Sequence, residues 1–211
     1  MFNLINKSYI KVKTIWGYDT NNMLLTHLPK SDSIAVLFPG ADYSCDKPLL
    51  HYARKAALLS GCDVLSLEYG FCRVTNPVEG NPFSQIVKDC YEAVRLCVEK
   101  KYNNIYFISK SFGTSVAGEV SNLVGYDKVN NLFLTPTEET IPYILRSKCT
   151  VVSGEKDKHF TQANIDSIRR NSSVDLHIID KAVHSLEIDD DYMESIKILE
   201  YITKVCAKFV S

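Results

Sequence analysis

The chain has 211 residues, of which 45% are hydrophobic and 23% charged, and its formal net charge is −1. This length and composition predict one domain, residues 1–211, with a full hydrophobic core. The balanced charge provides neither a basic surface for nucleic acid nor an acidic tail, so we expect no nucleic-acid partner.

Two further observations concern the cellular compartment in which the protein is expected. The segment Met1–Trp16 carries lysines throughout and lacks the apolar run of a signal peptide, and no segment approaches the length that crosses a bilayer. The seven cysteines are an odd number without a C-x-x-C pair, and most lie within apolar segments. They are predicted to be buried, reduced thiols, and the protein is expected in the cytoplasm, without a membrane partner.

Short apolar runs alternate with longer amphipathic ones along the chain, which is typical of an α/β fold with a parallel sheet. Residues 8–15 and 22–27 are expected to form an antiparallel hairpin at the edge of that sheet. The strands predicted after it are Ile34–Phe38, Asp63–Leu67, Asn104–Ile108, Asn131–Thr135, Cys149–Ser153 and Val174–Ile179.

Three helices are predicted in detail. The first begins at Asp46, with Pro48 close behind, and stops at Gly61. The second starts at Asn81-Pro82 and shows an apolar face at helical spacing. The third starts after Asp189–Asp191, whose charges favour a helix N-terminus. Its apolar stripe is interpreted as core rather than as a binding surface, and consists of Met193, Ile196, Leu199, Ile202, Cys206 and Phe209.

A candidate nucleophile lies directly after the third strand of the parallel set. The run Ser109-Lys110-Ser111-Phe112-Gly113 differs by one residue from the Gly-x-Ser-x-Gly nucleophile elbow, a strained turn that exposes the serine hydroxyl. Small flanking residues suit such a turn because neighbouring backbones approach closely. The alternative is an ordinary strand-to-helix loop in which Ser111 caps the helix.

A serine hydroxyl is a weak nucleophile, so acyl transfer requires a histidine base and usually a carboxylate that orients the histidine. Asp157 follows the strand that ends at Ser153, although it also suits a turn or a helix cap, and Glu155 is the competing acid. His184 follows a later strand and is the candidate base, with His159 as its rival.

The other three histidines, His27, His51 and His177, lie within predicted elements and are interpreted as packing or surface residues. The chain order is then serine, acid, histidine, which is the order of α/β-hydrolases.

The oxyanion that develops during acyl transfer needs two backbone N–H donors. Phe112, the residue after the nucleophile, is expected to supply the first. Ala41, in the loop Phe38-Pro39-Gly40-Ala41, is expected to supply the second, although a Pro-Gly pair is also common in plain turns.

With these residues in place, the chain resembles the α/β-hydrolase family over nearly its whole length, and is similar to small members of the dienelactone hydrolase and carboxylesterase-like groups. The resemblance implies a mostly parallel sheet with helices on both faces and no cap domain, because Pro136–Lys148 is too short for one. Two departures stand out. Ser109 replaces the first glycine of the elbow, and Pro39-Gly40 replaces a histidine-glycine pair in the oxyanion loop.

The resemblance also implies hydrolysis through an acyl-serine, without a metal or an organic cofactor, of a small ester, thioester or amide. Tyr43, Tyr69, Phe71 and Arg73 are expected near the substrate. Arg73 suits a substrate carboxylate, or is simply a solvated loop residue. The alternatives are an acyltransferase or peptidase with the same triad, and a catalytically silent binding protein of the same fold. No oligomeric state is predicted.

Overall fold

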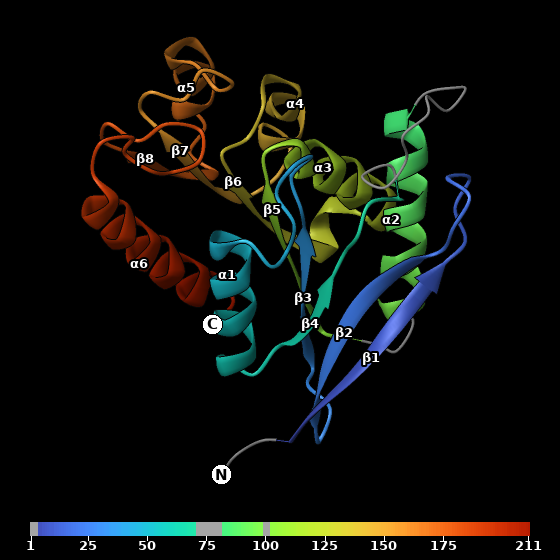
Figure 1. Ribbon diagram of the computed structural model, residues 1–211. Helices are drawn as coiled ribbons and strands as arrows, with labels where there is room; N and C mark the ends of the chain where they lie inside the picture. The colour runs from blue at the N-terminus through green and yellow to red at the C-terminus, as the bar shows by residue number, and fades with distance from the viewer. Residues whose placement is uncertain (1–3, 71–81, 99–101) are drawn as a thin grey trace.

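A computed structural model describes residues 4–70, 82–98 and 102–211 and places one eight-stranded sheet at the centre of this part of the chain (Figure 1). The strand order is β1-β2-β4-β3-β5-β6-β7-β8. β1 and β2 form an antiparallel hairpin, β2 is antiparallel to β4, and the remaining neighbours are parallel. The strands are β1 (Leu4–Val12), β2 (Thr20–Leu28), β3 (Ser33–Phe38), β4 (Asp63–Ser66), β5 (Asn104–Lys110), β6 (Val129–Leu134), β7 (Cys149–Gly154) and β8 (Val174–Ile179).

Every predicted strand is confirmed, Val174–Ile179 with identical bounds and the others with at least one end moved by a few residues. The central strands are apolar on both faces, as a covered parallel sheet requires. The hairpin begins earlier than predicted on both strands. Its first strand also ends earlier, at Val12 rather than at residue 15.

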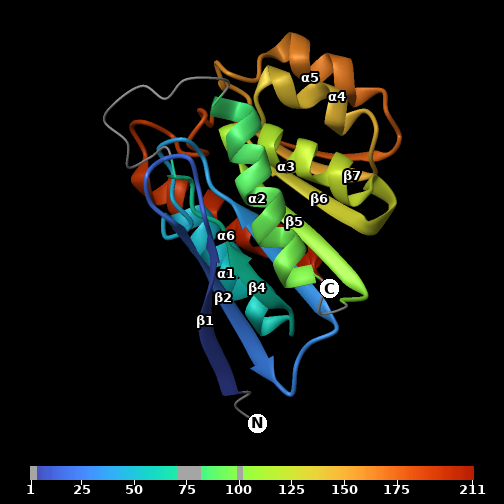
Figure 2. The same ribbon diagram turned by 90° about the vertical axis from the view of Figure 1, so that its right-hand side faces the viewer.

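Helices cover both faces of the sheet, as predicted. Figure 2 shows α2 and α3 together on one side, with α1 and α6 on the other. Two separate clusters of buried apolar side chains lie under these two layers. The helices are α1 (Pro48–Leu59), α2 (Pro82–Val98), α3 (Phe112–Val124), α4 (Ile141–Ile144), α5 (Gln162–Arg169) and α6 (Tyr192–Phe209), with 3-10 turns η2 (Tyr126–Lys128) and η3 (Glu138–Thr140).

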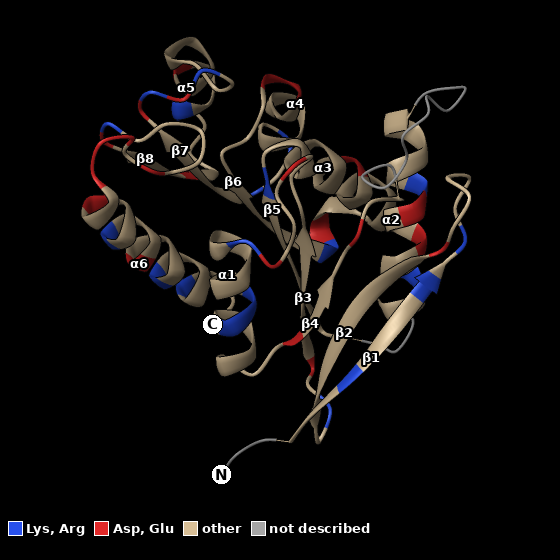
Figure 3. Cartoon of the chain, viewed as in Figure 1, with Lys and Arg blue, Asp and Glu red and all other residues tan. Residues whose placement is uncertain are grey.

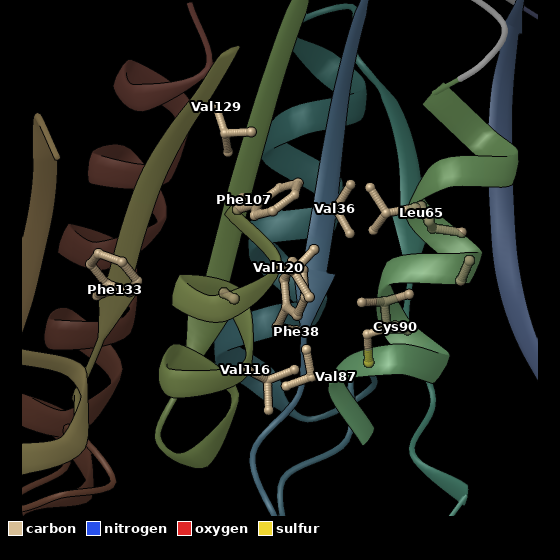
Figure 4. Close-up of a cluster of buried hydrophobic side chains, with 14 of the residues drawn as sticks. Val36, Phe38, Leu65, Val87, Cys90, Phe107, Val116, Val120, Val129 and Phe133 are labelled. Atoms are coloured by element: carbon tan, nitrogen blue, oxygen red, sulfur yellow. The ribbon is translucent and has the colours of Figure 1, made fainter. Parts of the chain in front are cut away.

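The core between the sheet and the α2–α3 layer is built on two phenylalanines of adjacent strands. Phe38 and Phe107 are fully buried, and their ring centroids lie 4.8 Å apart. Figure 4 shows the two rings in one cluster with Val116 and Val120 of α3. Because Phe38 and Phe107 lie near the ends of β3 and β5, this packing holds together the two strand ends that lead into the candidate site.

Two details of the predicted helices are wrong. α1 begins at Pro48 rather than Asp46: Lys47 is its N-cap residue, and the Asp46 carboxylate accepts from Arg54 Nη2 at 2.9 Å rather than from a helix N–H. In α6 the predicted stripe does not lie wholly in the core. Met193 and Ile196 are 55% and 56% exposed, since the first turns of α6 lie away from α1 (Figure 1).

The buried face of α6 is formed by Ile198, Ile202 and Cys206, which recur every four residues. The helix does start directly after the acidic run, as predicted. Asp191 is its N-cap, and its carboxylate accepts from the N–H of Glu194 at 2.9 Å.

The surface carries no single dominant charge in the view of Figure 3, where acidic and basic residues alternate along α2 and α6. None of the helices within the described residues is long and apolar enough to cross a membrane. Six cysteines are buried and form no disulfide within the described residues, and Cys72 lies outside them. Between β6 and β7 the chain forms only η3 and the short α4, which leaves no cap domain there.

Candidate active site

Ser111 lies in a sharp turn between β5 and α3, at the edge of the sheet where the parallel strands end. Its backbone has φ 52° and ψ −126°, a combination that residues other than glycine seldom adopt. Its N–H donates to the carbonyl of Leu134 in the adjacent strand β6 at 3.0 Å. Ser111 gives α3 no side-chain cap, so the turn is an elbow rather than the capped loop that the sequence left open.

The residues that flank Ser111 explain why the turn tolerates one serine and requires one glycine. Ser109 is fully buried, and its hydroxyl donates to the carbonyl of Leu132 at 3.2 Å, so a small polar side chain is accommodated where the Gly-x-Ser-x-Gly motif has glycine. At Gly113 a Cβ atom would lie 2.2 Å from the carbonyl oxygen of Pro39. No side chain fits at that position without moving the backbone of the 38–43 loop.

Ser111, His184 and Asp157 form a continuous hydrogen-bonded chain. His184 Nε2 lies 2.8 Å from Ser111 Oγ, and Nδ1 lies 2.9 and 2.8 Å from the two carboxylate oxygens of Asp157. An ionised carboxylate can only accept, so the network assigns the proton to Nδ1 and leaves Nε2 to accept from the serine hydroxyl. This is the tautomer that a general base requires.

The acid and the base meet because the ends of β7 and β8 are packed closely together. At Gly154, the last residue of β7, a Cβ atom would lie 2.2 Å from the carbonyl oxygen of Ala182, so the loop that carries His184 runs directly over the strand end. The Asp157 side chain is fully buried and also accepts from the backbone N–H groups of His159 and Phe160. These bonds hold the carboxylate in one orientation.

The two rival residues do not occupy the predicted positions of the acid and the base. Glu155 is exposed, and its carboxylate accepts from the N–H of Lys181 at 3.0 Å. His159 is exposed as well, and its ring packs edge-on against the ring of His184 with centroids 4.6 Å apart. Neither is within the hydrogen-bonded chain.

The predicted oxyanion loop lies against the elbow. The N–H of Gly40 donates to the carbonyl of Tyr43 at 2.9 Å, which closes a tight turn around Ala41. A Cβ atom at Gly40 would lie 3.5 Å from Ser111 Cβ, so the turn borders the nucleophile directly. The structure thus brings Ala41 and Phe112, the two predicted N–H donors, to the same end of the site.

Two of the predicted substrate-binding residues line a cavity of about 800 Å³ that starts at this turn. Tyr43 is half-buried, and its hydroxyl accepts from the N–H of Leu49 at 2.9 Å. Tyr69 is 3% exposed, with its ring edge-on to that of Phe112 at 5.9 Å between centroids. Phe71 and Arg73 lie outside the described residues.

Sequence reasoning missed one charged residue of the site. Lys110, directly before Ser111, is 2% exposed, and burial lowers the pKa of its ammonium to about 8, although Asp157 and Glu187 raise it. Its Nζ donates to Thr135 Oγ1 and to the carbonyl of His184. A signal existed: Lys110 continues the alternation of Tyr106 and Ile108 on one face of an apolar strand, a position typical of a buried side chain.

No group of three or more His, Cys, Asp or Glu side chains in the described part of the chain is arranged to hold a metal ion. The side chains that the structure does bring together are a serine hydroxyl, an imidazole and a carboxylate.

No protein-family model matches the sequence, and no curated protein matches it either. Solved structures do match. An α/β serine hydrolase homologue from Coxiella burnetii superposes with a TM-score of 0.69 at 14% identity, over 97% of both chains. Carboxyl esterase 2 from Tuber melanosporum gives 0.68 at 13% identity, over 98% of this chain and 85% of its own.

A third structure bears on the missing cap. An α/β serine hydrolase without a lid, from Xanthomonas campestris, matches with a TM-score of 0.64 at 12% identity, over 95% of this chain and 94% of its own. Together with the strand order, these likenesses establish that the chain has an α/β-hydrolase fold.

Proposed function

We propose that the protein is a serine hydrolase that cleaves a carboxylic ester, or a related acyl bond, of a small substrate through an acyl-serine intermediate. The observation that carries the proposal is the hydrogen-bonded chain Ser111–His184–Asp157 on a strained turn. The α/β-hydrolase fold supports it, and so do the solved structures of like fold that are described as esterases and serine hydrolases.

In the first half of the reaction Ser111 Oγ attacks the acyl carbon while His184 Nε2 accepts the hydroxyl proton. The Asp157 carboxylate holds the Nδ1–H and stabilises the imidazolium that forms. The imidazolium then donates its proton to the departing alkoxide, which leaves an acyl-Ser111. In the second half His184 takes a proton from water as the water oxygen attacks the acyl carbon. The bond from that carbon to Ser111 Oγ then breaks, His184 returns the proton to Oγ, and the carboxylic acid leaves.

Negative charge develops on the carbonyl oxygen in both halves. We assign its stabilisation to the backbone N–H groups of Phe112 and Ala41. Phe112 precedes Gly113 and Ala41 follows Pro39-Gly40, so the close approach of Gly113 to the Pro39 carbonyl brings the two segments together. The dense packing there keeps the two donors in place before the substrate arrives, so little reorganisation is needed during the reaction.

The cavity of about 800 Å³ beside the oxyanion turn is proposed to receive part of the substrate. It is lined by Tyr43 and Tyr69 together with charged side chains, so a small, partly polar acyl compound suits it better than a long aliphatic chain. The lack of a cap between β6 and β7 agrees with a substrate that is not enclosed.

A fluorophosphonate probe tests this proposal, because it labels only an activated serine. We expect labelling of the wild-type protein, its complete loss in Ser111→Ala, and its retention in Ser115→Ala. Ser115 is a matched control in α3, one turn after Ser111, with its hydroxyl bonded to Thr140 rather than to His184. Absence of labelling in folded wild-type protein would refute the proposal, and so would labelling that survives Ser111→Ala.

A panel of p-nitrophenyl esters of increasing acyl length, beside thioester and peptide substrates, then defines the bond that is cleaved. We expect activity on short acyl esters. Comparable or higher activity on the peptides would assign the site to a peptidase instead.

A further inference from the structure

Lys110 occupies a position where a charge is costly. It is the last residue of β5 and the immediate neighbour of the nucleophile, and only 2% of its surface is exposed. A buried ammonium is tolerated when its donors are used by good acceptors. The contacts of this side chain therefore indicate what it does.

The ammonium of Lys110 contacts three segments that border the site. It donates at 2.5 Å to Oγ1 of Thr135, the residue directly after β6. It also donates at 2.9 Å to the carbonyl of His184 in the loop after β8, which is called the base loop below. It also lies 5.4 Å from the centre of the Tyr43 ring, in the oxyanion turn. One cation thus ties the base loop and the oxyanion turn to the strand that carries Ser111.

We propose that Lys110 is a positioning residue, which holds the backbone of His184 against the nucleophile strand and so keeps Nε2 within reach of Ser111 Oγ. The inference rests on the proposed function. It is specific in structural terms, because the hydrogen bond is to the carbonyl of the base residue itself. Lys110 is linked covalently to Ser111, so this single bond relates the two reacting groups.

Thr135 provides independent support. It has φ 43°, which is rare for a β-branched residue and persists only where the surroundings enforce it. Two bonds enforce it here: its N–H donates to the carbonyl of Val152 at 2.7 Å, and its Oγ1 accepts from Lys110. The strained Thr135 therefore provides a fixed hydrogen-bond acceptor for the Lys110 ammonium at the edge of the site.

The charged and titratable groups around Lys110 determine the pH at which its contacts weaken. The carboxylates of Asp157 and Glu187 favour the ammonium, but burial outweighs them and lowers its pKa to about 8. Burial raises the pKa of Tyr43, so that phenol stays neutral in this range. Above pH 8 the two hydrogen bonds lose their charge assistance, which roughly halves their strength.

Three variants test the role in the intact protein. Lys110→Met removes the donor with a side chain of similar length, Lys110→Arg keeps a charge that does not titrate in this range, and Lys55→Met is a matched control on the surface of α1. We expect Lys110→Met to lower kcat/KM on a p-nitrophenyl ester by about 10- to 100-fold, through kcat, because a buried side chain does not touch the substrate. Lys110→Arg restores part of the loss.

The pH profile separates positioning from a merely structural role. We expect kcat/KM of the wild type to fall several-fold to a lower plateau as pH rises through about 8. We expect no such step in Lys110→Arg. Lys110→Met has a lower kcat/KM at every pH and also shows no step, whereas Lys55→Met retains it. A step that persists in Lys110→Arg would overturn the inference, and so would wild-type kcat/KM in a folded Lys110→Met.

The two proposals fail in different ways. If the wild type shows neither esterase activity nor labelling by a fluorophosphonate, the proposed function is wrong. If the wild type is labelled and Lys110→Met is labelled at the same rate, only the role of Lys110 is wrong. Thermal melts of each variant at pH 7 identify any loss that results from unfolding.

Discussion

Gly113→Ala is the substitution whose effect is best defined by the geometry. A Cβ atom at this position would lie 2.2 Å from the carbonyl oxygen of Pro39 and 2.7 Å from that of Phe38. Both obstacles are backbone atoms, so no side-chain rotation relieves the contact. The oxyanion turn would have to withdraw by roughly 1 Å, a displacement large enough to cost about 100-fold in rate.

The effect on stability can be worked from the same contact. Overpacking of this kind costs about 1–3 kcal/mol, and the better helix propensity of alanine returns at most about 1 kcal/mol. Because the obstacles are backbone atoms, the cost lies at the upper end of that range and leaves about 2 kcal/mol net. At about 2–4 °C for each kcal/mol in a chain of this size, we expect Gly113→Ala to lower the melting temperature by about 4–8 °C.

The matched control is Gly40→Ala, in the oxyanion turn that Gly113 contacts. There a Cβ atom would meet its nearest neighbours at 3.0 to 3.5 Å, and small adjustments suffice. Differential scanning calorimetry and kcat/KM on a p-nitrophenyl ester measure the two effects. A Gly113→Ala protein as stable and as active as the wild type would refute the argument that the elbow and the oxyanion turn are held by this contact.

Three further predictions follow from the contacts of the charged residues. Asp157→Asn is expected to lower kcat by about 10⁴-fold, because an amide no longer enforces the tautomer of His184; a loss below tenfold would contradict the assigned role. Glu155→Gln should leave kcat/KM within about threefold of the wild type, since its carboxylate only accepts from Lys181; a large loss would reinstate it as the acid. The third prediction concerns stability. Burial lowers the pKa of Lys110 from its ordinary value of 10.5 to about 8, so between these values the unfolded chain binds more protons than the folded one. The free energy of unfolding of the wild type, measured by urea titration, should therefore rise relative to that of Lys110→Met between pH 8 and pH 10.5, and a fall would refute the buried charge.

The proximity of the three residues of the proposed triad could be predicted from the sequence because each follows an apolar strand within a few residues. Parallel strands bring their carboxyl ends to one edge of a sheet, so residues more than 70 positions apart, such as Ser111 and His184, become neighbours once the strands are identified. The preference for Asp157 over Glu155 as the acid had a weaker basis in the sequence. It depends on how the turn after β7 is oriented, and that turn is held by contacts with the β8 side of the sheet.

The exposed start of α6 shows where periodicity alone is insufficient. Met193 and Ile196 fit a helical stripe as well as Ile198 and Ile202 do, and a single period cannot decide which of two adjacent faces is buried. The position of α1 explains the difference, because the later turns of α6 lie nearer to α1 than its first turns do (Figure 1). A prediction of that face needs the position of the neighbouring helix.

Lys110 could not be assigned from the sequence for a related reason. Strand alternation indicates that its side chain shares a face with Ile108, but a lysine at the end of a strand is commonly solvated. Here the base loop and the ring of Tyr43 come over it from segments that lie far away in sequence. Burial at this position is a property of the assembled site.

The strained backbone of the site has the same origin. Ser111 and Thr135 both have positive φ, and they follow the ends of the adjacent strands β5 and β6. In each case the N–H donates to the next strand along, to Leu134 and Val152 respectively, so the sheet's hydrogen bonding continues through the turn and enforces a conformation that the residue alone would avoid. The exposure of the Ser111 hydroxyl is therefore maintained by the register of three strands, and a substitution that shifts β6 against β7 should impair the nucleophile without touching it.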